Sequence, residues 1–94
     1  MRRLKVLDDV AALIRGLHPD LRRKVRSALG DIVDDPAIGK ALRDELAGLR
    51  SCRVSRFRIV YRVAGGAIEL VAVGPRRMIY EETWRRVRKN PPAR

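Results

Sequence analysis

The chain has 94 residues, a net charge of +11 and an apolar content of 46%. That length suits one small domain with a single hydrophobic core and excludes a second folded domain. The single cysteine excludes an intrachain disulfide and fits a reducing compartment. The sequence also lacks the apolar run of about 18 residues that a membrane span needs. We expect a cytoplasmic protein with one domain over residues 1–90 and a frayed tail at 91–94.

Positive charge is concentrated in the second half of the chain. Residues 1–49 hold ten basic and eight acidic side chains, whereas residues 50–94 hold twelve basic and three acidic ones. A field of this strength attracts polyanions, which favours a nucleic acid or an acidic protein as the partner. The alternative is a solvated basic surface whose arginine content reflects only codon usage.

The first half of the chain predicts two helices behind a short strand. Residues 3–7 alternate in polarity, as an edge strand does, and Asp8 or Asp9 is the expected N-cap of a first helix. A second helix is expected to begin at Pro19 and to end at Asp35, because a residue before proline avoids the helical conformation. Antiparallel packing of the two helices gives a hairpin whose apolar sides need a sheet to cover them.

The second half predicts that sheet. Residues 38–50 are expected to be a connection, after which the hydrophobic period changes to two over residues 57–63. One side of this strand is apolar and the other is largely cationic. Gly65-Gly66 is a hairpin turn signal, and residues 68–73 are the returning strand.

The spacing of Tyr80, Trp84 and Val87 predicts a short terminal helix that Asn90-Pro91-Pro92 stops. Trp84 then either covers the core or anchors an interface. The predicted class is α+β, with an N-terminal helical hairpin packed on a small, mainly antiparallel β-sheet and a short C-terminal helix.

Basic side chains outnumber all other candidates for chemistry. The set consists of Arg53, Arg56, Arg58, Arg62, Arg76 and Arg77. Strand alternation places the arginines of residues 56–62 opposite the apolar side, and the last two follow the neighbouring strand, where they can converge with Arg58 on one phosphate. Guanidinium groups bind phosphate bidentately and stay charged when partly buried. Tyr80 at the rim can stack on an unpaired base.

Five segments follow one another along the chain: LHPDLRRKVRSAL, GKALRDELAGLRSCRV, RFRIVYRV, a Gly-Gly turn and IELVAVGPRRMIYEE. Their order, from about Leu4 to Glu82, resembles the RelE/ParE superfamily, the small toxins of bacterial and archaeal type II toxin–antitoxin pairs. The resemblance implies a partner antitoxin that is small and acidic and folds as it binds. The superfamily has several branches, which include ribosome-dependent messenger-RNA endonucleases and gyrase inhibitors.

The resemblance also implies roles for single residues. Arg58 matches the family's phosphate-stabilising arginine, Arg76 its proton donor and Tyr80 the aromatic that orients or stacks the substrate base. Two basic positions on the strand before RFRIVY correspond to Arg53 and Ser55, so that a serine stands where the family often has a lysine. Pro75 similarly stands where a histidine or lysine is common, and Arg56, Arg62 and Arg77 are left as RNA-binding residues.

Acid–base groups are scarce around these arginines. Cleavage through the 2′-hydroxyl needs a proton acceptor, and an arginine is a poor base because its pKa exceeds about 12. We interpret His18 as a helix-start residue and Cys52 as a buried or semi-buried thiol, and we expect no metal and no cofactor. A host ribosome would align the reacting groups of the RNA, since positioning can lower a reaction barrier by roughly 7 to 11 kcal/mol.

The favoured function is therefore a toxin that cleaves messenger RNA in the ribosomal A site. A ParE-like gyrase inhibitor without hydrolytic activity is the alternative, and an inactive or regulatory relative is a third. The serine at position 55 gives weight to these alternatives.

Overall fold

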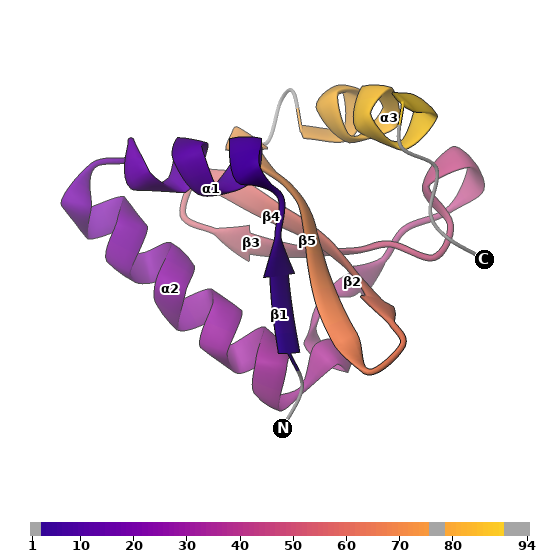
Figure 1. Ribbon diagram of the computed structural model, residues 1–94, viewed down its shortest axis with the longest axis horizontal. Helices are drawn as coiled ribbons and strands as arrows, with labels where there is room; N and C mark the ends of the chain where they lie inside the picture. The colour runs from indigo at the N-terminus through magenta and orange to yellow at the C-terminus, as the bar shows by residue number, and fades with distance from the viewer. Residues whose placement is uncertain (1–2, 76–78, 90–94) are drawn as a thin grey trace.

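The computed structural model describes residues 3–75 and 79–89 (Figure 1). Its elements are β1 (Arg3–Val6), α1 (Asp8–Arg15), α2 (Pro19–Asp34), η1 (Pro36–Ile38), β2 (Lys40–Ala41), η2 (Asp44–Leu46), β3 (Arg50–Val54), β4 (Phe57–Ala64), β5 (Ala67–Pro75) and α3 (Ile79–Lys89). The predicted α+β class is confirmed. The stop at residues 90–92 and the tail at 91–94 lie outside the described residues.

One five-stranded sheet, in the order β1-β5-β4-β3-β2, forms the centre of the molecule. β1 pairs with β5 in parallel, and the other three pairings are antiparallel. Two-residue turns join β3 to β4 and β4 to β5. The second turn is the predicted Gly65-Gly66, where φ angles of 56° and 79° require the freedom of glycine.

The two N-terminal helices begin differently. His18 caps α2, because its Nδ1 accepts a hydrogen bond of 3.2 Å from the Asp20 amide, which confirms its helix-start role. The prediction that Asp8 or Asp9 caps α1 is wrong. Leu7 occupies that position with extended backbone and no side-chain cap, because β1 runs directly into the helix. The two aspartates lie in the first turn, where negative charge favours the helix dipole.

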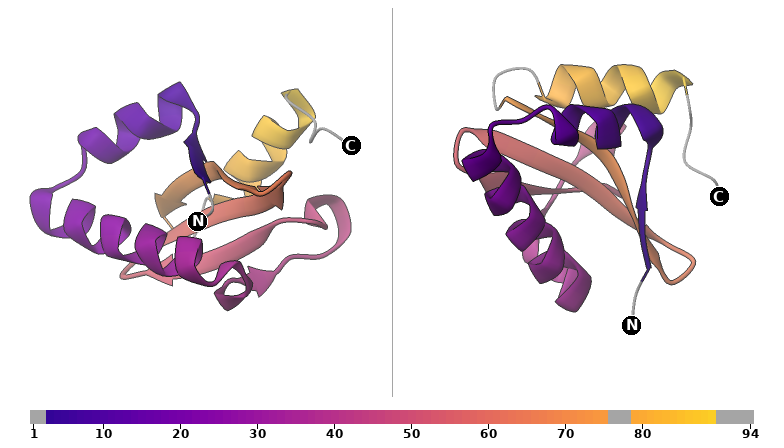
Figure 2. Two further views of the ribbon diagram at one scale, coloured as in Figure 1. Left: turned by 60° about the horizontal axis from the view of Figure 1, so that its bottom comes forward. Right: turned by 60° about the vertical axis from the view of Figure 1, so that its left-hand side comes forward.

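Hydrophobic cores lie on both faces of the sheet. Val10 of α1 and Val25 and Ile32 of α2 are buried with one face of β4 and β5. The other face packs Val60 against Ile79 of α3. Figures 1 and 2 show α1 and α2 diverging from their shared turn as a V, so the expected hairpin is an open one.

Tyr61 ties the connection after α2 to the central strand. Its hydroxyl donates a hydrogen bond of 2.6 Å to the Pro36 carbonyl and accepts one of 2.9 Å from the Gly39 amide. A Cβ on Gly39 would lie 2.8 Å from the Tyr61 Cε1 atom, so this close approach requires glycine. The start of β2 is thereby held beside β3.

Candidate nucleic-acid site on the β3–β4 face

Two arginines lie directly opposite each other at the centre of the candidate site. Arg53 of β3 is the register partner of Arg58 of β4, and Gly74 of β5 is the next partner across the sheet. Side chains in such pairs stand about 5 Å apart at Cβ, and like charges directly opposite destabilise the pairing. A bound anion near these two arginines would lower that repulsion.

Ser51 fixes one of these arginines. Arg58 Nη1 donates a hydrogen bond of 3.3 Å to the Ser51 Oγ atom, and Ser51 is only 2% exposed. The Arg58 Nε atom is buried and has no hydrogen-bond partner among the described residues. A buried donor left unpaired costs about 1 to 3 kcal/mol, and the Nε atom of Arg62 is buried without a partner in the same way.

Ser51 is the residue that the sequence reasoning missed. It shares a strand face with Arg53 because the two are two residues apart on β3. Ser55, which was assigned to that strand, lies instead in the β3–β4 turn with φ at 56°. The assignment of Ser55 to the strand is therefore wrong, because β3 ends at Val54 and the two-residue turn needs a left-handed residue. Counting back by two from Arg53 would have found Ser51.

The turn carries exposed charge next to the pair. Arg53 is exposed, and its Nε atom donates to the Ser55 carbonyl at 3.3 Å. Arg56 is exposed at the second turn position. RNA contact by Arg56 stays a prediction, and its position beside Arg53 is compatible with it.

Arg62 is placed differently from the other arginines. It forms an ion pair of 2.6 Å with Glu69, and the two side chains are 15% and 19% exposed. Four residues along β4 separate it from Arg58, a distance of about 13 Å. Its charge is compensated within the sheet, so RNA binding by Arg62 would require competition with Glu69.

Tyr80 lies on α3, which packs on the same sheet face as Arg58 through Ile79. Its side chain is 38% exposed and lines a groove with Glu45, Leu46 and Trp84. Trp84 is 37% exposed, so its ring both lines this groove and meets solvent. Arg76 and Arg77 lie outside the described residues, and their predicted roles remain predictions.

The described part of the chain contains no group of three His, Cys, Asp or Glu side chains that could hold a metal ion. Cys52 is half-buried, and burial raises the pKa of its thiol. Within the described residues, the side chains of Arg53 and Arg58 donate hydrogen bonds to serine oxygens, not to a carboxylate or an imidazole. The arrangement can therefore bind and stabilise a phosphate, while the contacts of the two arginines within residues 3–75 and 79–89 include no general base. Within residues 3–75 and 79–89, no helix is both long and apolar enough to cross a membrane.

Comparisons with known proteins confirm the resemblance. Residues 3–80 match the family described as the ParE toxin of the type II toxin–antitoxin system parDE. The RelBE2 toxin–antitoxin complex from Mycobacterium tuberculosis contains a similar chain with 28% identity and a TM-score of 0.70, which covers 80% of this chain and 98% of that chain. A mutant of the Escherichia coli toxin RelE in the free state is 20% identical to this chain, with a TM-score of 0.76. The match covers 97% of this chain and 98% of that chain. No curated protein matches the sequence.

Proposed function

Since the chain belongs to the ParE toxin family of type II toxin–antitoxin systems, we propose that it is a toxin that cleaves messenger RNA bound in the ribosomal A site. The observation that supports this function is the Arg53–Arg58 pair, two arginines at directly opposed positions of β3 and β4. Guanidinium groups carried at paired strand positions suit the charge that develops on a phosphate during its displacement.

The reaction needs little from this chain beyond the positive charge of Arg53 and Arg58. The RNA 2′-hydroxyl attacks the adjacent phosphorus and gives its proton to a water molecule. The bond from phosphorus to the 5′-oxygen breaks, and this oxygen takes up a proton from water as it leaves. The products are a 2′,3′-cyclic phosphate and a 5′-hydroxyl end. Arg58 and Arg53 stabilise the negative oxygens in the transition state, and Tyr80 stacks on a neighbouring base. The ribosome aligns the 2′-hydroxyl with the phosphorus, which compensates for the weak acid–base set.

The ribosome requirement provides the test. Purified protein should leave naked messenger RNA intact and cut the same RNA on programmed ribosomes, with 2′,3′-cyclic phosphate ends. Uncut messenger RNA on ribosomes, at protein concentrations that stop cell growth, would contradict the proposal.

A gyrase inhibitor is the second candidate. The family match is to ParE, and the contacts of Arg53 and Arg58 supply no general base. This function needs protein or DNA binding and no hydrolysis. A gyrase inhibitor should inhibit supercoiling or trap cleaved DNA, and it should leave translated messenger RNA uncut.

A cognate antitoxin completes the proposal. The Mycobacterium tuberculosis and Escherichia coli relatives were solved as RelBE2 and RelBE toxin–antitoxin complexes. A protein of charge +11 suits an acidic partner segment that also carries apolar anchors, since apolar contacts are not screened by salt. Co-expression with the neighbouring gene product should give a complex that survives about 0.5 M salt, whereas separate elution at low salt would remove the antitoxin from the proposal.

A further inference from the structure

A groove lies between η2 and α3, on the side of the sheet that carries Arg58. It is lined by Glu45 and Leu46 of η2 and by Tyr80 and Trp84 of α3, around a volume of about 390 Å³, and we call it the η2–α3 groove. Figure 1 shows η2 beside α3, and the two elements are in contact. The volume lies within the range of about 300 to 1,000 Å³ that is typical of small-molecule sites.

The two aromatic rings are held on one side of α3. Ile79 and Thr83 are fully buried, and the Thr83 hydroxyl donates a hydrogen bond of 2.7 Å to the Ile79 carbonyl. Tyr80 and Trp84 each follow one of these buried residues, so they share the next side of the helix, about 6 Å apart along its axis. Both side chains remain exposed in part. Each ring therefore borders the groove from a backbone that the core fixes.

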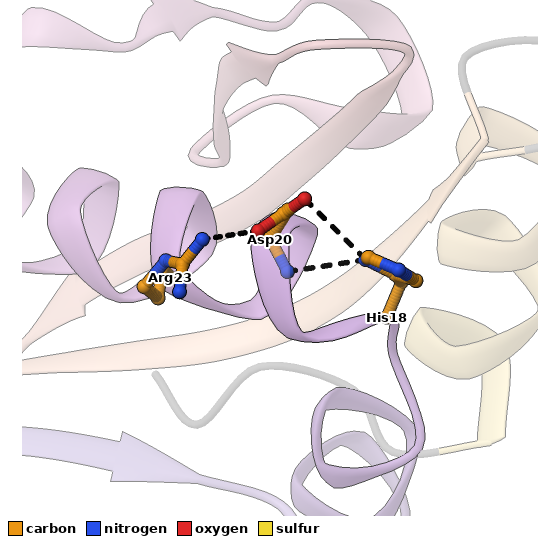
Figure 3. A network of polar contacts seen from close by, with 3 residues as sticks. All are labelled: His18, Asp20 and Arg23. Atoms are coloured by element: carbon orange, nitrogen blue, oxygen red, sulfur yellow. Dashed lines mark hydrogen bonds and ion pairs between the residues drawn. The ribbon is translucent and has the colours of Figure 1, made fainter.

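Glu45 is the one charged residue among the four that line the groove. It is exposed, and its carboxylate has no hydrogen bond or ion pair with any residue that the structure describes. Figure 3 shows the opposite case on α2, where Asp20 pairs with Arg23 and also faces His18. A carboxylate only accepts hydrogen bonds and repels phosphate, so Glu45 suits a ligand group that presents donors and carries no negative charge.

The groove adjoins the proposed phosphate site. Gly74 is the register partner of Arg58, and a Cβ on Gly74 would lie 3.4 Å from the Ile79 Cδ1 atom. Tyr80 is the next residue after Ile79, so the groove begins beside the strand position that is paired with Arg58. An RNA strand with a phosphate at Arg58 can therefore place an adjacent base in the groove.

The Watson–Crick edges of the four RNA bases differ in what they offer a carboxylate. Guanine presents two neighbouring donors, N1–H and the N2 amino group, which match the two oxygens of a carboxylate. Adenine and cytosine present one amino group next to an acceptor nitrogen, and uracil presents one N–H between two carbonyl oxygens. Unpaired bases are read by such edge contacts while they stack on aromatic side chains. Guanine is therefore the base that this groove fits.

We propose that the η2–α3 groove binds one unpaired guanine base, which stacks on Tyr80 and Trp84 and donates two hydrogen bonds to the Glu45 carboxylate. This inference rests on the proposed function, because the base belongs to the messenger RNA that the toxin cleaves. It makes Glu45 a residue that sets the sequence preference of cleavage. A protein segment fits less well, because the antitoxin expected for a chain of charge +11 is acidic and Glu45 would repel its carboxylates.

Trp84 is the only tryptophan of the chain, so its fluorescence reports on the occupancy of the groove. The probes are single-stranded RNAs of about seven nucleotides, all uridine except for a central guanosine, inosine or adenosine. Binding without ribosomes is measured by quenching of Trp84 and, in parallel, by the anisotropy of labelled RNA. Glu45→Gln tests the carboxylate. Glu81→Gln is the matched control, since Glu81 lies on α3 and pairs with Arg85 outside the groove lining. Circular dichroism verifies that both variants fold.

The guanosine RNA should quench Trp84 and bind at least about tenfold more tightly than the adenosine RNA. The inosine RNA, which lacks the N2 amino group, should lie between them. Glu45→Gln should remove this preference or turn it toward adenine, because an amide can accept from the adenine N6 amino group and donate to N1. Glu81→Gln should retain the preference for guanine.

Equal binding of the guanosine and adenosine RNAs, or an unchanged guanine preference in Glu45→Gln, would overturn the proposal. So would anisotropy that saturates without quenching of Trp84, no binding of any probe up to about 1 mM, or the same loss of preference in Glu81→Gln. Quenching by the antitoxin alone would assign the groove to the protein partner and refute the base. The assay needs no cleavage, so a failure of the endonuclease function leaves the base preference measurable. Ribosome-dependent cleavage without a base preference would refute only the groove.

Discussion

Replacing Arg58 should separate activity from stability. Arg58→Ala removes a transition-state contact of about 2.7 to 4 kcal/mol, a loss on the order of 100- to 1000-fold in the single-turnover rate on programmed ribosomes. Arg58→Lys keeps the charge but loses the guanidinium fork that can hold a phosphate with two parallel hydrogen bonds. One hydrogen bond to a charged group is worth about 1.5 to 3 kcal/mol, so the lysine variant should be slower by about 10- to 150-fold.

Folding should barely respond to either change. Arg58 leaves a buried donor unpaired in the free protein, and its hydrogen bond to Ser51, at 3.3 Å, is a long one. We expect the free energy of unfolding in urea to change by less than about 1 kcal/mol.

Arg62→Ala is the matched control on the same strand. It leaves the carboxylate of Glu69, only 19% exposed, without its ion-pair partner. This should lower the free energy of unfolding by about 1 to 3 kcal/mol, below the range for fully buried pairs, while cleavage by the folded protein stays near that of the wild type. Wild-type cleavage by folded Arg58→Ala, or an equal loss of cleavage in Arg62→Ala without a stability change, would refute the assignment of the site to the Arg53–Arg58 pair.

Further predictions concern Tyr61 and Tyr80. Gly39→Ala should lower the free energy of unfolding by about 2 kcal/mol or more in urea titrations, because the new Cβ meets the Tyr61 ring; an unchanged midpoint would contradict the close approach. Burial raises the pKa of Tyr61 above its unfolded value of about 10, so its stabilisation is complete below that pH and is lost as the pH rises through the folded pKa. Tyr61→Phe should remove this part of the alkaline stability loss, and an identical pH profile would speak against it. Tyr80→Phe should retain more cleavage activity than Tyr80→Ala if the ring stacks on a base. Equal losses of activity would show that the hydroxyl is the functional group.

Local signals in the sequence predicted the elements that local interactions define. Pro19 and Asp35-Pro36 mark the ends of α2 through backbone constraints that act within a few residues. Gly65-Gly66 likewise fixes the β4–β5 turn. The strand β2 was missed because its two residues have no pattern of their own and are defined by pairing with β3.

The site was predictable only in part for a related reason. Alternation along RFRIVYRV placed Arg58 on the polar side of its strand, but alternation does not give the register with the neighbouring strand. The pairing of Arg58 with Arg53, the contact with Ser51 and the ion pair of Arg62 with Glu69 all depend on that register. A bulge between β4 and β5 adds an irregularity, since Val60 pairs with Ala72 while Tyr61 pairs with Leu70.

Parallel pairing of β1 with β5 joins the first strand of the chain to the last, with Arg3 opposite Ala67. During synthesis β1 leaves the ribosome long before its partner exists, so this edge of the sheet closes late and at a large loop-closure cost. The strands β3, β4 and β5 are joined by two-residue turns and can pair as soon as they emerge. A chain interrupted before residue 67 lacks both the partner of β1 and the strand beside Arg58, so the sheet is not assembled until β5 has been synthesised.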